Sequence, residues 1–192
     1  MSSGTDGTAQ NAQYEMQIER RMERGKTTLY AMTFSNSGRE IFASTMDGTV
    51  KIFDYPSMSL LHTLSGHSAA CYTVAHSPAG SYVAVGSGDS TVSLWDTHTW
   101  LSTHSLTSGN QTTSVRDLSF SFDGAYLVAG GGSDAKEGGP GMNIFHVDTG
   151  DVVHTVETTN FPSYVAWHPN RYWIAYAGDP GGLKVVGSGT GL

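Results

Sequence analysis

Histidine and cysteine are the residue types in this sequence that could most readily bind a metal or take part in catalysis. The chain contains 8 His residues and a single cysteine, Cys71. Zinc sites need closely spaced ligands, such as a His-Glu-x-x-His run or a Cys-x-x-Cys pair. The sequence contains neither pattern, and a lone cysteine forms no internal disulfide. We therefore expect these residues to be structural, and we expect no metal and no cofactor.

Two glycine-containing segments resemble parts of nucleotide-binding loops without completing them. The run 25–27 (Gly-Lys-Thr) matches the end of a phosphate-binding loop, but the position five residues before it is Arg20 instead of glycine. The run 86–88 (Gly-Ser-Gly) begins a dinucleotide-binding pattern whose third glycine would be residue 91, which is Thr91. No group of residues combines a nucleophile, a base and an oxyanion donor. We therefore predict a protein that is not an enzyme and has no small-molecule substrate.

The composition is that of one soluble, folded domain. The 192 residues are 38% hydrophobic and 10% aromatic, which is too apolar for a disordered chain. No run approaches the roughly 18 apolar residues that a membrane span requires, so we expect no contact with a membrane. The chain carries 10 Lys and Arg against 17 Asp and Glu, a net charge of -7. Because phosphate contacts need clustered positive charge, we expect RNA to be bound only indirectly, through protein partners.

A short pattern recurs four times and organises the chain. It is clearest at 74–80 (VAHSPAG) and 118–124 (LSFSFDG), and each copy carries one anchor residue: Phe34, His76, Phe120 and Trp167. These anchors are 42, 44 and 47 residues apart. A second anchor follows each first one after 19, 19, 25 and 19 residues, at Phe53, Trp95, Phe145 and Val186. Self-similarity at this period is typical of stacked repeat units.

The longer spacing in the third repeat locates an insertion. Six additional residues separate its two anchors, and they fall in the glycine-rich segment 130–141. Backbone N–H groups in such a segment could hold an anion. The segment carries Asp134 and Glu137 against a single Lys136, however, and no helix pattern follows it. We therefore interpret it as a loop between two strands.

Each repeat consists of short alternating segments separated by turn residues. In the second repeat, strands are predicted at 71–76, 82–86, 91–95 and 100–106. The third of these strands ends in Trp95-Asp96. Four strands in about 40 to 45 residues that close on Trp-Asp are the signature of a WD40 blade. A lone four-stranded sheet leaves two faces to cover, so such blades stack side by side and bury each other's faces.

These residues resemble the WD40-repeat family and, within it, the family of WD-repeat subunits of the THO complex. The similarity is carried by 82–96 (YVAVGSGDSTVSLWD), 115–124 (VRDLSFSFDG), 147–151 (VDTGD) and 164–169 (YVAWHP). It extends from about Thr28 to Asp179. The resemblance covers the C-terminal half of such a subunit, because the family's propeller has about seven blades and this chain supplies four.

The resemblance implies an all-β fold, a partial WD40 β-propeller with about four blades of four-stranded antiparallel sheet. The blades are expected at approximately 28–64, 65–106, 114–156 and 163–192. Residues 1–27 are expected to form an N-terminal tail or short helix, because they include good helix formers with nearly balanced charges. A four-blade arc leaves one blade face bare at each end, so we expect the isolated chain to be marginally stable.

In WD40 blades a His at the blade entry, an Asp in a tight turn, a strand Ser and the Trp form a buried hydrogen-bond relay. The matching residues here are His67, Asp89 and Trp95. The usual serine position, ten residues before the tryptophan, is Val85, so we expect that link to be missing or replaced by Ser87. The other repeat anchors are expected to be core residues and not a surface for stacking nucleic acid; they are Phe34, Phe53, Phe120, Phe145 and Trp167.

The resemblance also implies a function. The chain is expected to be a non-enzymatic scaffold and a subunit of the nuclear THO/TREX complex, which couples transcription to mRNA processing and export. Its partners would be the protein subunits of the THO complex. An alternative is the substrate receptor of a cullin-type ubiquitin ligase, or another WD40 adaptor. Such receptors typically carry Trp-Asp-x-Arg after a third strand, whereas here Trp95-Asp96-Thr97 is followed by His98.

Overall fold

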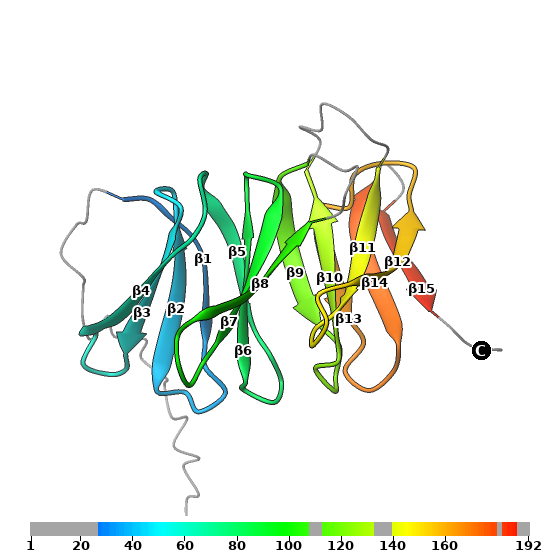
Figure 1. Cartoon of the computed structure of the whole chain (residues 1–192). Coiled ribbons are helices and arrows are strands. Elements are labelled where there is room, and N and C mark those ends of the chain that lie inside the picture. Colours follow the sequence, from blue (N-terminus) through cyan, green and yellow to red (C-terminus); the bar gives the residue numbers. More distant parts are fainter. Residues whose placement is uncertain (1–26, 108–112, 133–139, 180–181, 188–192) are drawn as a thin grey trace, which may run out of the picture.

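The described part of the chain consists of four antiparallel sheets that follow one another in sequence order. The computed structural model describes residues 27–107, 113–132, 140–179 and 182–187, so the expected tail or helix at 1–27 lies almost entirely outside the described residues. The sheets stand side by side as the blades of an arc (Figure 1). The predicted fold class, an all-β partial propeller, is confirmed. No helix in the described ranges is long and apolar enough to cross a membrane.

Within each sheet the strands are ordered as they occur in the chain. Blade 1 contains β1 Leu29–Phe34, β2 Glu40–Thr45, β3 Thr49–Asp54 and β4 Leu60–Ser65. Blade 2 contains β5 Cys71–His76, β6 Tyr82–Ser87, β7 Thr91–Asp96 and β8 Ser102–Thr107. Blade 3 contains β9 Val115–Phe120, β10 Tyr126–Gly131, β11 Gly141–His146 and β12 Val152–Glu157. Blade 4 has three strands among the described residues, β13 Tyr164–Trp167, β14 Trp173–Asp179 and β15 Gly182–Gly187.

The turn between the first and second strands has the same structure in the first three blades. In blade 2 the Gly80 N–H donates to the Ser77 carbonyl oxygen over 2.9 Å, and Gly80 has a φ of 79°, which costs little without a Cβ. The Ser77 hydroxyl accepts from the Tyr82 N–H at 3.0 Å and closes the hairpin. Ser35 and Ser121 accept the equivalent hydrogen bond in blades 1 and 3. A serine directly after the first anchor is therefore a turn residue in three repeats.

The core lies between the blades, because each blade is a single sheet. Blades 1 and 2 bury Phe42, Val50, Ile52, Leu64, Cys71, Val74, Val83, Val85 and Trp95 between them. Blades 2 and 3 bury Ala84, Val92, Leu94, Leu106, Val115, Leu118, Phe120, Leu127, Ala129, Phe145 and Val147. Blades 3 and 4 bury Val128, Met142, Val165, Ile174 and Tyr176. Removing these apolar faces from water stabilises the arc by about 25 cal/mol per Å².

Glycines let neighbouring blades approach closely near their first strands. A Cβ on Gly86 of β6 would stand 2.5 Å from Val115 Cγ1 and 2.7 Å from Thr73 Cγ2. At the equivalent place in blade 3, a Cβ on Gly130 would stand 2.4 Å from the Pro162 carbonyl oxygen. These distances are well below ordinary contact, so a larger residue at either position would displace the next blade.

One residue expected in the core, Phe34, is exposed. Its side chain is 53% exposed, whereas those of Phe53, Phe120 and Phe145 are 4%, 8% and 2% exposed. The first anchor of a blade packs on the preceding blade, as Phe120 does in the cluster that it shares with blade 2. No described blade precedes blade 1, and Phe34 contacts the Tyr55 ring edge-on, with centroids 5.4 Å apart. The prediction that Phe34 is a core residue was wrong for this reason.

Cys71 is expected to report on the interface between blades 1 and 2. Its exposed fraction is 0%, and burial, followed by the charges of Asp89 and Asp47, raises its pKa to about 12. At pH 8 the thiol is therefore almost entirely protonated, whereas the thiolate is the reactive form. We expect iodoacetamide to leave Cys71 unmodified in the native chain and to modify it in urea, measured by mass spectrometry. Equal rates in both states would contradict this packing.

Candidate functional site

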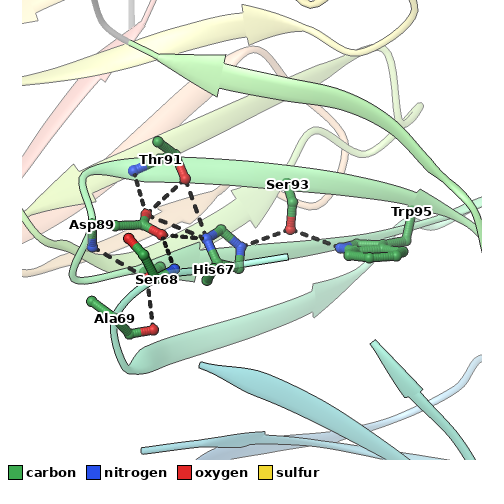
Figure 2. A network of polar contacts seen from close by, with 8 residues as sticks. His67, Ser68, Ala69, Asp89, Thr91, Ser93 and Trp95 are labelled. Atoms are coloured by element: carbon green, nitrogen blue, oxygen red, sulfur yellow. Dashed lines mark hydrogen bonds and ion pairs between the residues drawn. The ribbon is translucent and has the colours of Figure 1, made fainter. Parts of the chain in front are cut away.

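A chain of polar contacts runs through blade 2 from a loop to its third strand (Figure 2). His67 lies in the loop between β4 and β5, Asp89 in the turn between β6 and β7, and Trp95 on β7. His67 Nδ1 is 3.0 Å from Asp89 Oδ2, and His67 Nε2 is 2.7 Å from Ser93 Oγ. Trp95 Nε1 donates to the same Ser93 oxygen over 2.7 Å. The structure thus brings the three relay residues together through Ser93.

The serine of this relay is not the one expected from the sequence. The sequence predicted either that no serine connects His67 to Trp95 or that Ser87 does, whereas the structure shows Ser93 in this place. Ser93 stands two residues before Trp95 on the same strand, so both side chains point to the same face of the sheet. Ser87 instead donates to the Ala69 carbonyl oxygen over 3.2 Å and accepts from the Asp89 N–H at 3.2 Å, which orders the turn. The expectation was therefore wrong. The two-residue spacing along β7 is the signal that could have identified Ser93.

Asp89 joins the loop that contains His67 to the start of β7. Its carboxylate accepts from the Ser68 N–H over 2.9 Å, from the Thr91 N–H over 3.1 Å and from the Thr91 hydroxyl over 2.7 Å. Burial by itself would raise the pKa of Asp89, but the hydrogen bonds from Thr91 and Ser68 and the contact with His67 outweigh it and hold the pKa below its ordinary value. Asp89 is therefore a charged, hydrogen-bonded junction between the His67 loop and β7.

The order Ser93, His67, Asp89 resembles the connectivity of a hydrolase triad, but its environment is structural. A catalytic serine needs a free hydroxyl that can reach a substrate carbonyl next to oxyanion donors. Ser93 is 5% exposed, the His67 side chain is 3% exposed, and the Ser93 oxygen already accepts from Trp95 Nε1. The same hydroxyl is also hydrogen-bonded to His67 Nε2, inside the interface between blades 1 and 2. These hydrogen bonds fix the loop before β5 against the sheet of blade 2.

The equivalent positions in blades 1 and 3 also carry polar contacts. In blade 1, hydrogen bonds from Thr45 and then Thr49 lower the pKa of Asp47 to about 2, and Phe53 stands where blade 2 has Trp95. In blade 3, Asn143 accepts a hydrogen bond from the Thr155 hydroxyl over 2.9 Å. Each contact stays within one blade. In the described residues, blade 2 alone connects its tryptophan to the loop that precedes the blade.

Trp167, the anchor on the first strand of blade 4, is partly buried and lines a cavity between blades 3 and 4. The cavity has a volume of about 510 Å³ and is bordered by Tyr126, Ile144, Tyr172 and Val186 among others. Trp167 Nε1 is buried and has no hydrogen-bond partner in the described part of the chain. Trp95 Nε1, by contrast, is bonded to Ser93. The interface between blades 3 and 4 is therefore less completely filled than the one that contains the relay.

No cluster of three or more His, Cys, Asp or Glu side chains that could hold a metal is present among the described residues. The eight histidines are spread over several blades, and His67 and His76 form hydrogen bonds with residues that are distant in the sequence. His67 belongs to the relay, and His76 Nδ1 accepts from the Asn36 N–H over 3.1 Å across the interface between blades 1 and 2. Cys71 is buried in the same interface.

A stripe of aromatic and cationic side chains crosses the first strands of three blades. These first strands neighbour one another along the inside of the arc. The Tyr30 and Tyr72 rings meet edge-on with centroids 5.0 Å apart, and Arg116 Cζ lies 4.0 Å from the centroid of the Tyr72 ring. We call these three residues the inner stripe. Sequence reasoning missed the stripe, although its members are 42 and 44 residues apart, as the first anchors of these repeats are.

Ser93→Ala is expected to lower the free energy of unfolding by about 1 to 3 kcal/mol. The substitution leaves His67 Nε2 and Trp95 Nε1 buried without a partner, which costs their desolvation. Urea denaturation followed by Trp fluorescence measures the change. Ser105→Ala is the matched control, because Ser105 pairs with Ser93 on the neighbouring strand but is exposed; its effect should stay within about 0.5 kcal/mol. Equal effects would show that Ser93 does not connect the relay.

Asp89→Asn is expected to reduce the acid sensitivity of the fold. The folded-state pKa of Asp89 is lower than its unfolded value of about 3.9, so its charged form stabilises the fold above pH 4 and this stabilisation is lost as the pH falls through the folded-state pKa. The variant should be less stable than the parent at pH 7, and the difference should shrink at pH 3, measured by urea midpoints. Asp148→Asn, which removes an exposed carboxylate, is the control. A pH-independent difference would contradict this role.

Comparison with known proteins identifies relatives along most of the chain. The chain is 39% identical over 142 residues to "THO complex subunit 3" of Arabidopsis thaliana, which covers 74% of this chain and 42% of that protein. It is 32% identical over 149 residues to "WD repeat-containing protein AAC3" of Dictyostelium discoideum, covering 75% of this chain and 29% of that protein. The chain thus spans less than half the length of both relatives.

A solved structure and a family model agree with a propeller built from WD40 repeats. The β-propeller domain of Cps50 (Swd1) from Myceliophteria thermophila superimposes with a TM-score of 0.75 at 19% identity, over 85% of this chain and 55% of that one, which shows the fold. The model "WD domain, G-beta repeat" matches residues 20–54, 58–96 and 100–136, more than half of the sequence. With its blades, its Trp95-Asp96 strand end and these matched repeats, the chain belongs to the WD40-repeat family.

Proposed function

We propose that this chain is a non-enzymatic scaffold subunit of the nuclear THO complex, which couples transcription to mRNA processing and export. The observation that carries the proposal is the 39% identity to THO complex subunit 3 over 142 residues. That identity is twice the 19% found with a solved WD40 propeller that shares the fold. WD40 propellers generally mediate contacts between proteins, so the THO protein subunits are the proposed partners and the nucleus is the proposed location.

The polar chemistry of the described residues supports a scaffold. The His67 relay is buried and satisfied by its own blade, and the buried Cys71 thiol has its pKa raised by burial to about 12. These groups therefore stabilise the arc. The net charge of -7 opposes unaided binding to RNA, so RNA is contacted through the partner subunits.

The inner stripe is the proposed docking surface for a THO subunit. Tyr30 is 46% exposed and Arg116 is exposed, while Tyr72 between them holds both in place. Tyrosine and arginine are enriched at the centres of protein interfaces, because they provide a large contact area with a polar end. A stripe that crosses three blades presents these groups on a rigid support.

Affinity purification of the tagged chain from nuclear extract tests the assignment. We expect mass spectrometry to detect the THO protein subunits in the eluate, with and without RNase, because the contacts are between proteins. Absence of THO subunits would contradict the proposal, and recovery of cullin ligase subunits in their place would favour a ubiquitin-ligase receptor. Loss of the THO subunits after RNase would contradict protein-mediated docking.

The double variant Tyr30→Ala, Arg116→Ala tests the docking surface. If both residues are interface anchors, each worth more than the 1.4 kcal/mol that corresponds to a factor of ten, recovery of the THO subunits should fall at least tenfold. Val153→Ala is the control, because Val153 is 50% exposed but lies on β12, the outer strand of blade 3. Unchanged recovery with the double variant would place the docking surface elsewhere.

A further inference from the structure

A cleft with a volume of about 470 Å³ opens between blades 1 and 2, which stand side by side in Figure 1. Its walls are the turn between β1 and β2, the turn between β5 and β6, the turn between β7 and β8, and the start of β2. The relay instead uses the loop between β4 and β5 and the turn between β6 and β7. The cleft therefore lies at the opposite end of the two blades from the relay.

Glu40, which lines the cleft, departs from the pattern of the repeat. It is the first residue of β2, whereas the first residues of the second strands in the other blades are aromatic, namely Tyr82, Tyr126 and Trp173. The four positions are equivalent in register, because each pairs with the residue directly after the second anchor of its blade. Blade 1 thus presents a carboxylate to the cleft where other blades carry a ring.

His76 is a second departure in the same cleft. The first anchors of the other blades are aromatic, namely Phe34, Phe120 and Trp167, whereas His76 places a partly buried imidazole in the wall. Its ring centroid lies 5.3 Å from that of Phe42. Burial lowers the pKa of His76 below its ordinary value, so the imidazole is largely uncharged at neutral pH. It therefore adds a polar wall without a competing positive charge.

Trp100 is a third departure, in the turn between β7 and β8. Its N–H donates to the Asp96 carbonyl oxygen over 2.8 Å, and its φ is 55°. The equivalent residues Met58 and Gly150 have φ values of 59° and 75°, so the turn requires a left-handed residue. This conformation is costly for a bulky side chain, and such strain is concentrated at functional sites. The His62 ring, 5.3 Å away, supports the indole.

The cleft combines a carboxylate with aromatic rings. The Ser35 and Ser37 hydroxyls donate to Glu40 Oε2, the latter over 2.9 Å, so Oε1 stays available to a donor from outside the chain. Phe42 and Trp100 both line the cleft, with ring centroids 6.1 Å apart. A carboxylate accepts charge-assisted hydrogen bonds and an aromatic face attracts a cation. Together these groups are suited to a positively charged side chain.

We propose that this cleft binds an arginine side chain of a partner protein. The guanidinium group donates to Glu40 and lies against the indole of Trp100. Arginine suits the cleft better than lysine, because its planar group pairs with carboxylates and stacks on aromatic faces.

Charge complementarity identifies this occupant. Among the described residues that line the cleft, Glu40 is the only Asp or Glu and none is Lys or Arg. The cleft lies at the other end of the first strands from the inner stripe, and the inference goes beyond the proposed THO assignment without resting on it.

Titration of the purified full chain with N-acetyl-arginine amide, followed by NMR, tests the site. We expect saturable shifts of the Trp100 indole signal and of the Gly80 backbone amide signal, since both residues line the cleft. The indole signal of Trp95, which is bonded to Ser93, should stay in place. N-acetyl-citrulline amide, which has the same shape without the charge, should bind far more weakly. Equal binding of the two compounds would overturn the proposal, and tighter binding of N-acetyl-lysine amide would overturn the choice of arginine.

Glu40→Gln tests the carboxylate. The variant keeps the size of the side chain and an oxygen that accepts from the two serines, but it removes the charge. Binding of the arginine amide should weaken at least about tenfold, the loss expected for one hydrogen bond between charged groups. Glu157→Gln is the matched control, because Glu157 is an exposed acid on β12, away from the cleft. Equal weakening by both variants would indicate a response to net charge alone and would overturn the proposal.

Trp100→Gly tests the aromatic wall. Glycine occupies the equivalent position in blade 3, as Gly150, so the left-handed turn should persist, and protection of Cys71 from iodoacetamide verifies the fold. Binding, followed at the Gly80 amide, should weaken about fivefold or more through loss of the cation–π contact. Met58→Gly makes the same change in blade 1, outside the cleft lining, and should leave binding unchanged. Unchanged binding by Trp100→Gly would overturn the proposed site.

Discussion

The packing of each blade on the blade before it is the interaction on which the rest of the structure depends. A single sheet has two faces, and neither can remain in water at low cost when it carries residues such as Phe42, Leu94 and Leu127. Every apolar cluster in the described structure joins two successive blades. Stability is therefore close to a sum of contacts between neighbours, as in other repeat proteins. The turns and hydrogen bonds position the strands so that this contact forms.

The relay in blade 2 shows how a buried polar network can coexist with that packing. A polar group inside an interface stabilises a unique structure when each of its donors and acceptors is satisfied, and is costly otherwise. Ser93 satisfies Trp95 Nε1 and His67 Nε2 together, and backbone N–H groups satisfy Asp89. Trp167 Nε1 has no such partner among the described residues, and a cavity lies beside it. The interface around Trp95 is therefore more completely hydrogen-bonded and packed than the interface around Trp167.

The sequence was sufficient to predict the fold class, because the strand and turn pattern is local and repeats. Glycines and serines at the hairpins, such as Ser77 and Gly80, specify turns without reference to the rest of the molecule. Ser93 was not predicted because the family places its serine ten residues before the tryptophan. Ser93 instead lies two residues before Trp95, on the same face of the same strand. The burial of Phe34 was predicted wrongly because it depends on a preceding blade. The local sequence around Phe34 carries no information about whether that blade is present. The inner stripe was missed because it requires three repeats to be superimposed.

The small residues beside the first strands have a consequence for the shape of the whole arc. Gly86 and Gly130 let the inner edges of neighbouring blades nearly touch, while bulky residues such as Leu106 and Phe145 separate the blades farther out. Each interface is thus a wedge, narrow inside and wide outside. The bulk allowed at one strand position therefore sets the angle between blades, and with it the number of blades that would complete a full turn. Glycines at the closest points of contact between blades, such as Gly86 and Gly130, therefore help to set the curvature of the arc.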